Sequence, residues 1–196
     1  MGLNKENAKT HYLSIQGGKI AQRVQEATAF TRTRTLETGK VIHELLYDNA
    51  EGILSAITTR EGTYGKELHI TLKDDGGTYV LQVKLSSGAA SSFLRALPNV
   101  NLTAPLMIIP KTQDKDGVKR TSIILSQNNA GVKWAFTKDA PGDLPAMKQI
   151  KVKGVAQWDD SEQLEYFEKM IAEINNKLSA IVPPVENAEV SHDLPF

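Results

Sequence analysis

Aromatic and cationic side chains adjoin at several points of the chain. Phe30, Arg32 and Arg34 alternate along one short stretch, and Tyr64 stands two residues before Lys66. Cations can neutralise phosphates while aromatic rings stack on bases, each stack contributing about 1–3 kcal/mol, so these residue types predict contacts with single-stranded nucleic acid. The candidate contacts are Phe30, Arg32, Arg34, Tyr64, Lys66, Lys111, Lys115, Lys119, Arg120, Lys133, Trp134 and Phe136.

Other site chemistry has little support in the sequence. The chain has no Cys, and none of its four His residues has a second ligand at metal-binding spacing. It also lacks a Gly-x-Ser-x-Gly nucleophile motif and a phosphate-cradling Gly-rich loop. We therefore expect no catalytic residues, no metal and no cofactor, and a binding protein rather than an enzyme.

The charge is divided unevenly along the chain, although the net charge is zero. Residues 1–153 hold 21 Lys and Arg against 14 Asp and Glu, a net +7, and residues 154–196 carry the opposite −7. A basic body followed by an acidic segment is typical of nucleic-acid-binding proteins. The alternative is that each part simply has a solvated, charged face.

No segment of the sequence predicts insertion into a membrane. The apolar runs are far shorter than the roughly 20 residues that cross a bilayer, and the first residues do not resemble a secretory signal. We expect a cytoplasmic protein, in the host cytoplasm if the chain is encoded by a phage.

Short alternating segments predict a mainly β fold. A helix is expected over 88–97, capped by a preceding Ser and ended by Pro98. The expected order of elements is several strands, one helix and then further strands. This is the order of an OB-fold, a five-stranded Greek-key barrel. Strands are expected near 18–24, 28–37, 40–47, 52–59, 67–73, 78–85, 105–111, 120–126 and 132–137.

In an OB-fold the loop between the fourth and fifth strands commonly contacts nucleic acid. The corresponding loop here is expected over 111–120, a segment rich in Lys and Arg. Residues 138–157, which contain Pro141-Gly142 and Leu144-Pro145, are expected to form a connection.

An amphipathic helix is expected near the C-terminal end, starting at a capping Asp160 with Gln163 as its return partner. Two uses of its apolar seam remain open: packing on the barrel, or association with a second copy of the chain. The expected organisation is an OB-fold-like nucleic-acid-binding domain over 1–157, this helix over 158–181 and a disordered acidic tail over 182–196. The apolar seam consists of Leu164, Phe167, Ile171, Ile174 and Leu178.

The end of the tail, Asp193-Leu194-Pro195-Phe196, resembles the acidic tip of bacterial and phage single-stranded DNA-binding proteins. The body resembles phage-type members of this family more loosely, for example over 92–99 and 133–138. The resemblance implies an OB-fold that protects single-stranded DNA during replication, recombination and repair. It also implies that Asp193, Leu194, Pro195 and Phe196 bind replication or recombination proteins.

The sequence therefore predicts a sequence-independent single-stranded DNA-binding protein. One alternative is a structural β-barrel that oligomerises through its C-terminal helix, and another is an OB-fold mediator of strand annealing.

Overall fold

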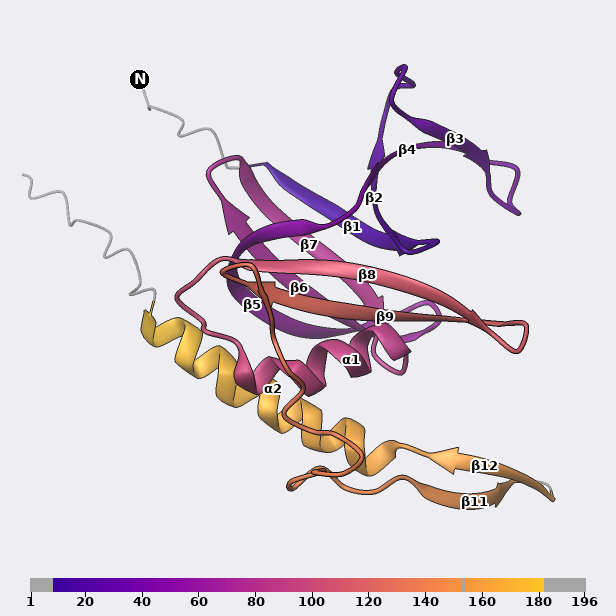
Figure 1. Ribbon diagram of the computed structural model, residues 1–196. Helices are drawn as coiled ribbons and strands as arrows, with labels where there is room; N and C mark the ends of the chain where they lie inside the picture. Colours follow the sequence, from indigo (N-terminus) through magenta and orange to yellow (C-terminus); the bar gives the residue numbers. More distant parts are fainter. Residues whose placement is uncertain (1–8, 153, 182–196) are drawn as a thin grey trace, which may run out of the picture.

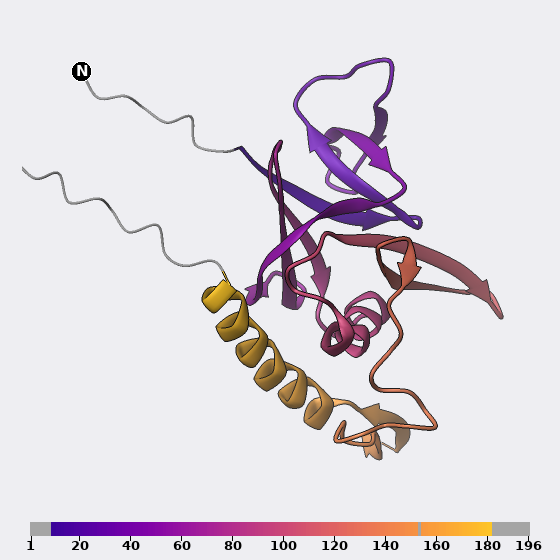
Figure 2. The ribbon, with the colours of Figure 1, turned by 60° about the vertical axis from the view of Figure 1, so that its left-hand side comes forward.

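A large mixed β-sheet dominates the structure, a computed structural model that describes residues 9–152 and 154–181. Helix α1 packs against this sheet, helix α2 runs beside it, and a separate two-stranded sheet precedes α2 (Figure 1). Figure 2 shows from a second direction that α2 lies along the outside of the large sheet. The described part of the chain is mainly β, as the sequence predicts.

The large sheet has the strand order β10-β9-β8-β5-β6-β7-β1-β2-β4-β3, and β11 pairs with β12 in the small sheet. The helical segments are α1 (Gly88–Ala96), the 3-10 turn η1 (Leu97–Asn99) and α2 (Ser161–Ile181). The strands are β1 (Thr10–Gln16), β2 (Lys19–Val24), β3 (Arg32–Thr35), β4 (Val41–Tyr47), β5 (Ala50–Gly62), β6 (Gly65–Asp74), β7 (Gly77–Lys84), β8 (Leu106–Lys115), β9 (Val118–Gln127), β10 (Ala130–Gly131), β11 (Lys148–Val152) and β12 (Val155–Asp159).

The core lies between the inner face of the large sheet and the two helices. Alternate residues of β6, Leu68, Ile70 and Leu72, are almost completely buried, as expected for a strand with one buried face. Phe93 and Leu94 of α1 are fully buried in the same cluster. The side chain of Ser87 accepts a hydrogen bond from the backbone N–H of Ala90 at 3.2 Å, which caps α1 as the sequence predicts.

Strand β5 links the two halves of the large sheet. Its first residues pair with β8, and from Ile53 onward it pairs with β6. Gly52 lies at this crossover, where a Cβ atom would be 2.8 Å from the carbonyl oxygen of Lys73. A side chain at residue 52 would therefore force the neighbouring strand to move.

The closed OB-fold barrel expected from the sequence is not formed. Strand β1 pairs in parallel with β7, so it occupies the edge of β7 that a closing strand would need. The β1–β2 hairpin then continues into β4 and β3, and the sheet remains open. Strand β1 is absent from the predicted strands, although it forms a hairpin with the adjacent β2; only its second partner, β7, lies far away along the chain.

Two other segments differ from the sequence-based expectation. The expected strand at 132–137 is irregular. The N–H of Val132 still donates to Leu125 of β9, but the backbone that follows bonds to α1 and η1. The expected connection at 138–157 contains the hairpin β11–β12. In addition, the expected strand at 28–37 is confined to β3.

Helix α2 uses its apolar seam within the chain. Phe167, Ile171, Ile174 and Leu178 are buried in the common core, and Leu164 packs against it. The predicted capping pair of Asp160 and Gln163 is wrong. The carboxylate of Asp159 accepts from the N–H of Ser161 at 3.0 Å, and the side-chain amide of Gln163 donates to the carbonyl oxygen of Pro145 at 2.6 Å. Packing on the sheet is therefore the use of the seam that the structure shows.

One side chain of α2 also bonds to the backbone of β5, at Ile57. Beyond the short stretch paired with β8, the outer edge of β5 has no strand partner among the described residues. Asn175 covers this edge: its Oδ1 accepts from the N–H of Ile57 at 3.0 Å, and its Nδ2 donates to the carbonyl of Ile57 at 2.5 Å.

We expect Asn175→Leu to lower the free energy of unfolding by about 1–3 kcal/mol, because it removes both partners of a buried backbone site. Urea unfolding followed by circular dichroism should show a lower midpoint with an unchanged slope. The matched control is Asn176→Leu, since Asn176 is exposed on the same helix. Equal losses in the two variants would contradict this role of Asn175.

Candidate nucleic-acid interface

The twelve candidate contacts fall into four groups on the structure. They lie on the β8–β9 hairpin, before and on β3, at the β5–β6 turn, and in the irregular segment after β10. The first and second groups belong to hairpins that extend from the body (Figure 1). Each group is affected differently by burial and by neighbouring carboxylates.

The β8–β9 hairpin carries the most accessible cations. The register pairs Lys111 with Ser122 and Gln113 with Arg120, so Lys111 and Arg120 lie on the same face, whereas Lys119 lies on the other. Lys111, Lys119 and Arg120 are exposed, and no described carboxylate lies within ion-pair distance of them. These cations are therefore available to an external anion.

The expected loop over 111–120 is instead the end of this hairpin. Strand pairing continues to Lys115 and Val118, and only Asp116 and Gly117 lie between the strands. Both turn residues have positive φ, 56° and 73°, a conformation that glycine and aspartate tolerate better than most residues. The paired backbone fixes the spacing of the cations, which an irregular loop would not do.

The two arginines of the second group share one carboxylate within the chain. Arg32 donates to Glu44 at 2.6 Å, and Arg34 donates to both oxygens of this carboxylate at 3.0 Å. The Glu44 side chain is completely buried. The hydrogen bonds from Arg34, and next those from Arg32, lower the pKa of Glu44 below its ordinary value. These two arginines therefore stabilise the β3–β4 hairpin.

The sequence predicts that Phe30 shares a strand face with Arg32 and Arg34. This prediction is wrong, because β3 begins only at Arg32. It lies in a turn before β3, where its backbone N–H donates to Oγ1 of Thr28 at 3.3 Å. Its ring is 87% exposed, so it remains accessible to a base.

The β5–β6 turn presents one accessible ring and one paired cation. The Tyr64 side chain is 85% exposed at the end of the turn. The ammonium group of Lys66 lies 2.6 Å from the Glu168 carboxylate of α2, and this hydrogen bond raises the pKa of Lys66. Lys66 thus joins the turn to α2, while Tyr64 faces solvent.

The segment after β10 separates its two aromatic rings. Trp134 is 47% exposed, whereas Phe136 is buried and contacts Tyr166 of α2 edge to face. The backbone is anchored on α1, since the N–H of Ala135 donates to the carbonyl of Arg95 at 2.8 Å. Phe136 is therefore a core residue, and only Trp134 remains a candidate for stacking.

A further exposed aromatic residue, Trp158 of β12, is not among the contacts predicted from the sequence. The Pro and Gly content of 138–157 predicts a connection, and Trp158 falls at the start of the segment assigned to the C-terminal helix, 158–181, whereas in the structure it belongs to β12. A local signal for a hairpin does exist there. Apolar and polar residues alternate over 149–152, and Gly154 follows as a turn residue.

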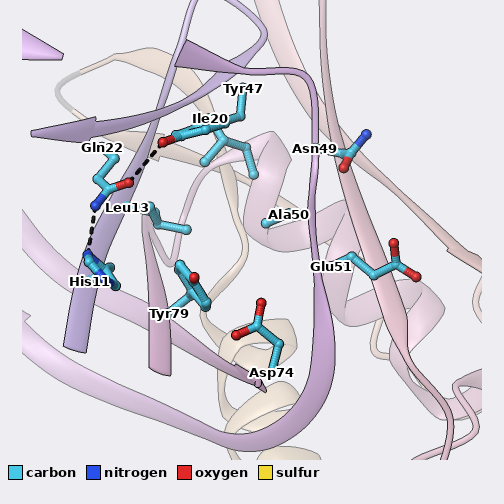
Figure 3. Close-up of a pocket in the computed structure, with 10 residues that line it drawn as sticks. All are labelled: His11, Leu13, Ile20, Gln22, Tyr47, Asn49, Ala50, Glu51, Asp74 and Tyr79. Atoms are coloured by element: carbon cyan, nitrogen blue, oxygen red, sulfur yellow. Dashed lines mark hydrogen bonds between the residues drawn. The ribbon is translucent and has the colours of Figure 1, made fainter. Parts of the chain in front are cut away.

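A cavity of about 250 Å³ lies where β1, β2 and β7 meet the start of β5 (Figure 3). Gln22 connects two of its rings, with Nε2 at 2.7 Å from Nδ1 of His11 and Oε1 accepting from the Tyr47 hydroxyl at 3.2 Å. Glu51 and Asp74 also line the cavity, and the lining residues include no Lys or Arg. Two carboxylates without a cation make this cavity unsuitable for phosphate.

Comparison with known protein families, with curated proteins and with solved structures gives no match. Within the described ranges, no group of three or more His, Asp or Glu side chains is arranged to hold a metal ion. None of the described helices is long and apolar enough to cross a membrane.

The proposed tip at 193–196 lies outside the described residues. Function must therefore be inferred from the chain's own geometry.

The buried Glu44 gives the β3–β4 hairpin a defined pH dependence. A carboxyl whose pKa is lowered by folding stabilises the folded state above its unfolded pKa, and this contribution is lost as pH falls through the folded pKa. We expect Glu44→Gln to reduce the unfolding midpoint at pH 7, with the difference from the original chain narrowing below about pH 4. Urea titrations from pH 7 to pH 3 measure this. A difference that stays constant over this range would contradict the ionised pair.

Proposed function

We propose that this protein binds single-stranded DNA without sequence specificity. The observation that carries the proposal is the β8–β9 hairpin, which presents Lys111, Lys119 and Arg120 without intramolecular carboxylate partners among the described residues. Cations spaced along an extended backbone suit a polyanion with a regular phosphate repeat.

The strand order supports the proposal. The portion β7-β6-β5-β8-β9 has the order 3-2-1-4-5 of an OB-fold, and α1 connects the third and fourth of these strands. In this assignment β8–β9 corresponds to the fourth and fifth strands, and the connection between them is one of two OB-fold loops that commonly contact nucleic acid. The other is the β5–β6 turn, which carries Tyr64. We therefore propose an OB-fold-like core extended by β1–β4, with one sheet edge left open.

The exposed rings supply the second part of the chemistry. Tyr64 and Trp134 are accessible and can stack on bases of any type, because every base has a π-face. Phosphate contacts from Lys111 and Arg120 carry no sequence information. Together these contacts give affinity for an unpaired strand without selection of its sequence.

We also propose that Asp193, Leu194, Pro195 and Phe196 recruit replication or recombination proteins. This part of the proposal is based on the resemblance of that segment to the tips of single-stranded DNA-binding proteins. The alternative of self-association through the C-terminal helix has less support than single-strand binding, because four of its seam residues are buried in the core, namely Phe167, Ile171, Ile174 and Leu178.

Fluorescence anisotropy tests the proposed function with a labelled 20-nucleotide single strand and a duplex of equal length. We expect the single strand to bind more tightly than the duplex, and log Kd to rise with log salt by about 0.7 per phosphate neutralised. Measurements between roughly 50 and 200 mM salt give this slope. Equal affinity for the duplex, or no binding of either, would overturn the proposal.

The hairpin makes a separate prediction about individual cations. We expect Lys111→Gln and Arg120→Gln each to weaken single-strand binding and to reduce the salt slope by about 0.7. Lys169→Gln is the matched control, because Lys169 is an exposed cation on α2, outside the proposed interface. If all three substitutions weaken single-strand binding equally, the loss of affinity reflects the net charge of the protein. The β8–β9 hairpin would then have no specific role in binding.

A further inference from the structure

The hairpin β11–β12 projects away from the large sheet (Figure 1). Its five residue pairs, from Lys148 with Asp159 to Val152 with Val155, form a sheet in which each strand pairs only with the other among the described residues. An isolated two-stranded hairpin is marginally stable in water. A partner that contacts this hairpin would therefore add to its order.

The base of the hairpin is attached to α2 by polar contacts. Lys148 forms an ion pair with Glu162 in the first turn of α2. The Asp159 carboxylate accepts from the backbone N–H of Ser161 at 3.0 Å and from its hydroxyl at 2.6 Å. These contacts fix the direction of the hairpin and leave its outer part free.

One face of the hairpin has the composition of a nucleic-acid contact. The register places Gln149 opposite Trp158 and Lys151 opposite Ala156, and all four residues share this face. The Trp158 side chain is 65% exposed. Lys151 is diagonal to it, a relation that separates Cα atoms by about 7–8 Å and lies within reach of a long side chain.

The opposite face differs in charge and in its contacts. It carries Lys148 and Asp159, both bonded at the base, together with the exposed apolar residues Ile150 and Val155. The face with Trp158 thus has an indole, an amide and a cation but no carboxylate. This charge favours an anionic partner with flat rings over an acidic or purely apolar one.

We propose that β11–β12 is a DNA-binding arm, in which a base of the single strand stacks on Trp158 and a neighbouring phosphate pairs with Lys151. This inference rests on the proposed function and adds a contact region to it. A chain that binds DNA only through the β8–β9 hairpin would leave Trp158 in water in the complex.

The chain has two tryptophans, so each can be observed alone. In full-length Trp134→Phe, unlabelled (dT)20 should quench the emission of Trp158. The (dT)20 concentration at half-maximal quenching should agree with the Kd measured by anisotropy of labelled (dT)20. Full-length Trp158→Phe reports Trp134 in the same titration. The contrary result is that both variants bind (dT)20 tightly while only Trp134, observed in Trp158→Phe, is quenched. That result would overturn the proposal of a DNA-binding arm and leave the proposed function intact.

A second measurement tests the energetic role of the ring. We expect Trp158→Ala to raise the Kd for (dT)20 by about 5- to 150-fold, the equivalent of one lost base stack. Val155→Ala, on the opposite face of the same hairpin, should leave the Kd unchanged. Equal effects of the two substitutions would assign the loss to unfolding of the hairpin and overturn the stacking role.

Two other outcomes would also overturn the inference, and they have distinct signatures. Without DNA, an emission maximum of Trp158 that shifts to the blue with rising protein concentration would show that the arm contacts a second copy of the chain. Absence of any (dT)20 binding by the full chain would remove the proposed function together with the arm.

Discussion

The backbone of β5 is the constraint on which the other elements depend, because the buried part of this strand needs hydrogen-bond partners. Three different elements provide them: β8 at its start, β6 on the other side, and Asn175 of α2 on the edge that β8 leaves. The crossover at Gly52 sets where β8 departs from β5. The direction of the cationic β8–β9 hairpin thus follows from a requirement of the core.

The charge of the sequence is a poor guide to the charge available for binding. Arg32 and Arg34 share one buried carboxylate, and Lys66 is paired with α2, so three of the predicted contacts stabilise the fold. The cations of the β8–β9 hairpin lack such partners among the described residues because the hairpin extends beyond the packed part of the sheet. Distance from the core, more than local sequence, separates structural cations from accessible ones.

Local patterns predicted the elements whose partners are close in sequence. The hairpin β6–β7 and helix α1 were predicted because alternation, turn residues and a Ser cap are read directly from neighbouring residues. The open sheet was not predicted, since the pairing of Thr10 with Thr78 leaves no local signal. The same limit applies to the site: Phe136 and Trp134 are two residues apart, and only tertiary packing decides that Phe136 is buried and Trp134 exposed.

The parallel pairing of β1 with β7 also has a consequence for the order in which the chain folds. Closing the loop between Thr10 and Thr78 costs more conformational entropy than forming any of the adjacent hairpins. During synthesis the β1–β2 hairpin leaves the ribosome long before β7 exists to receive it. We therefore expect β1 to dock after the β6–β7 hairpin has formed, and until then the edge of β7 is open to the first strand of another nascent chain.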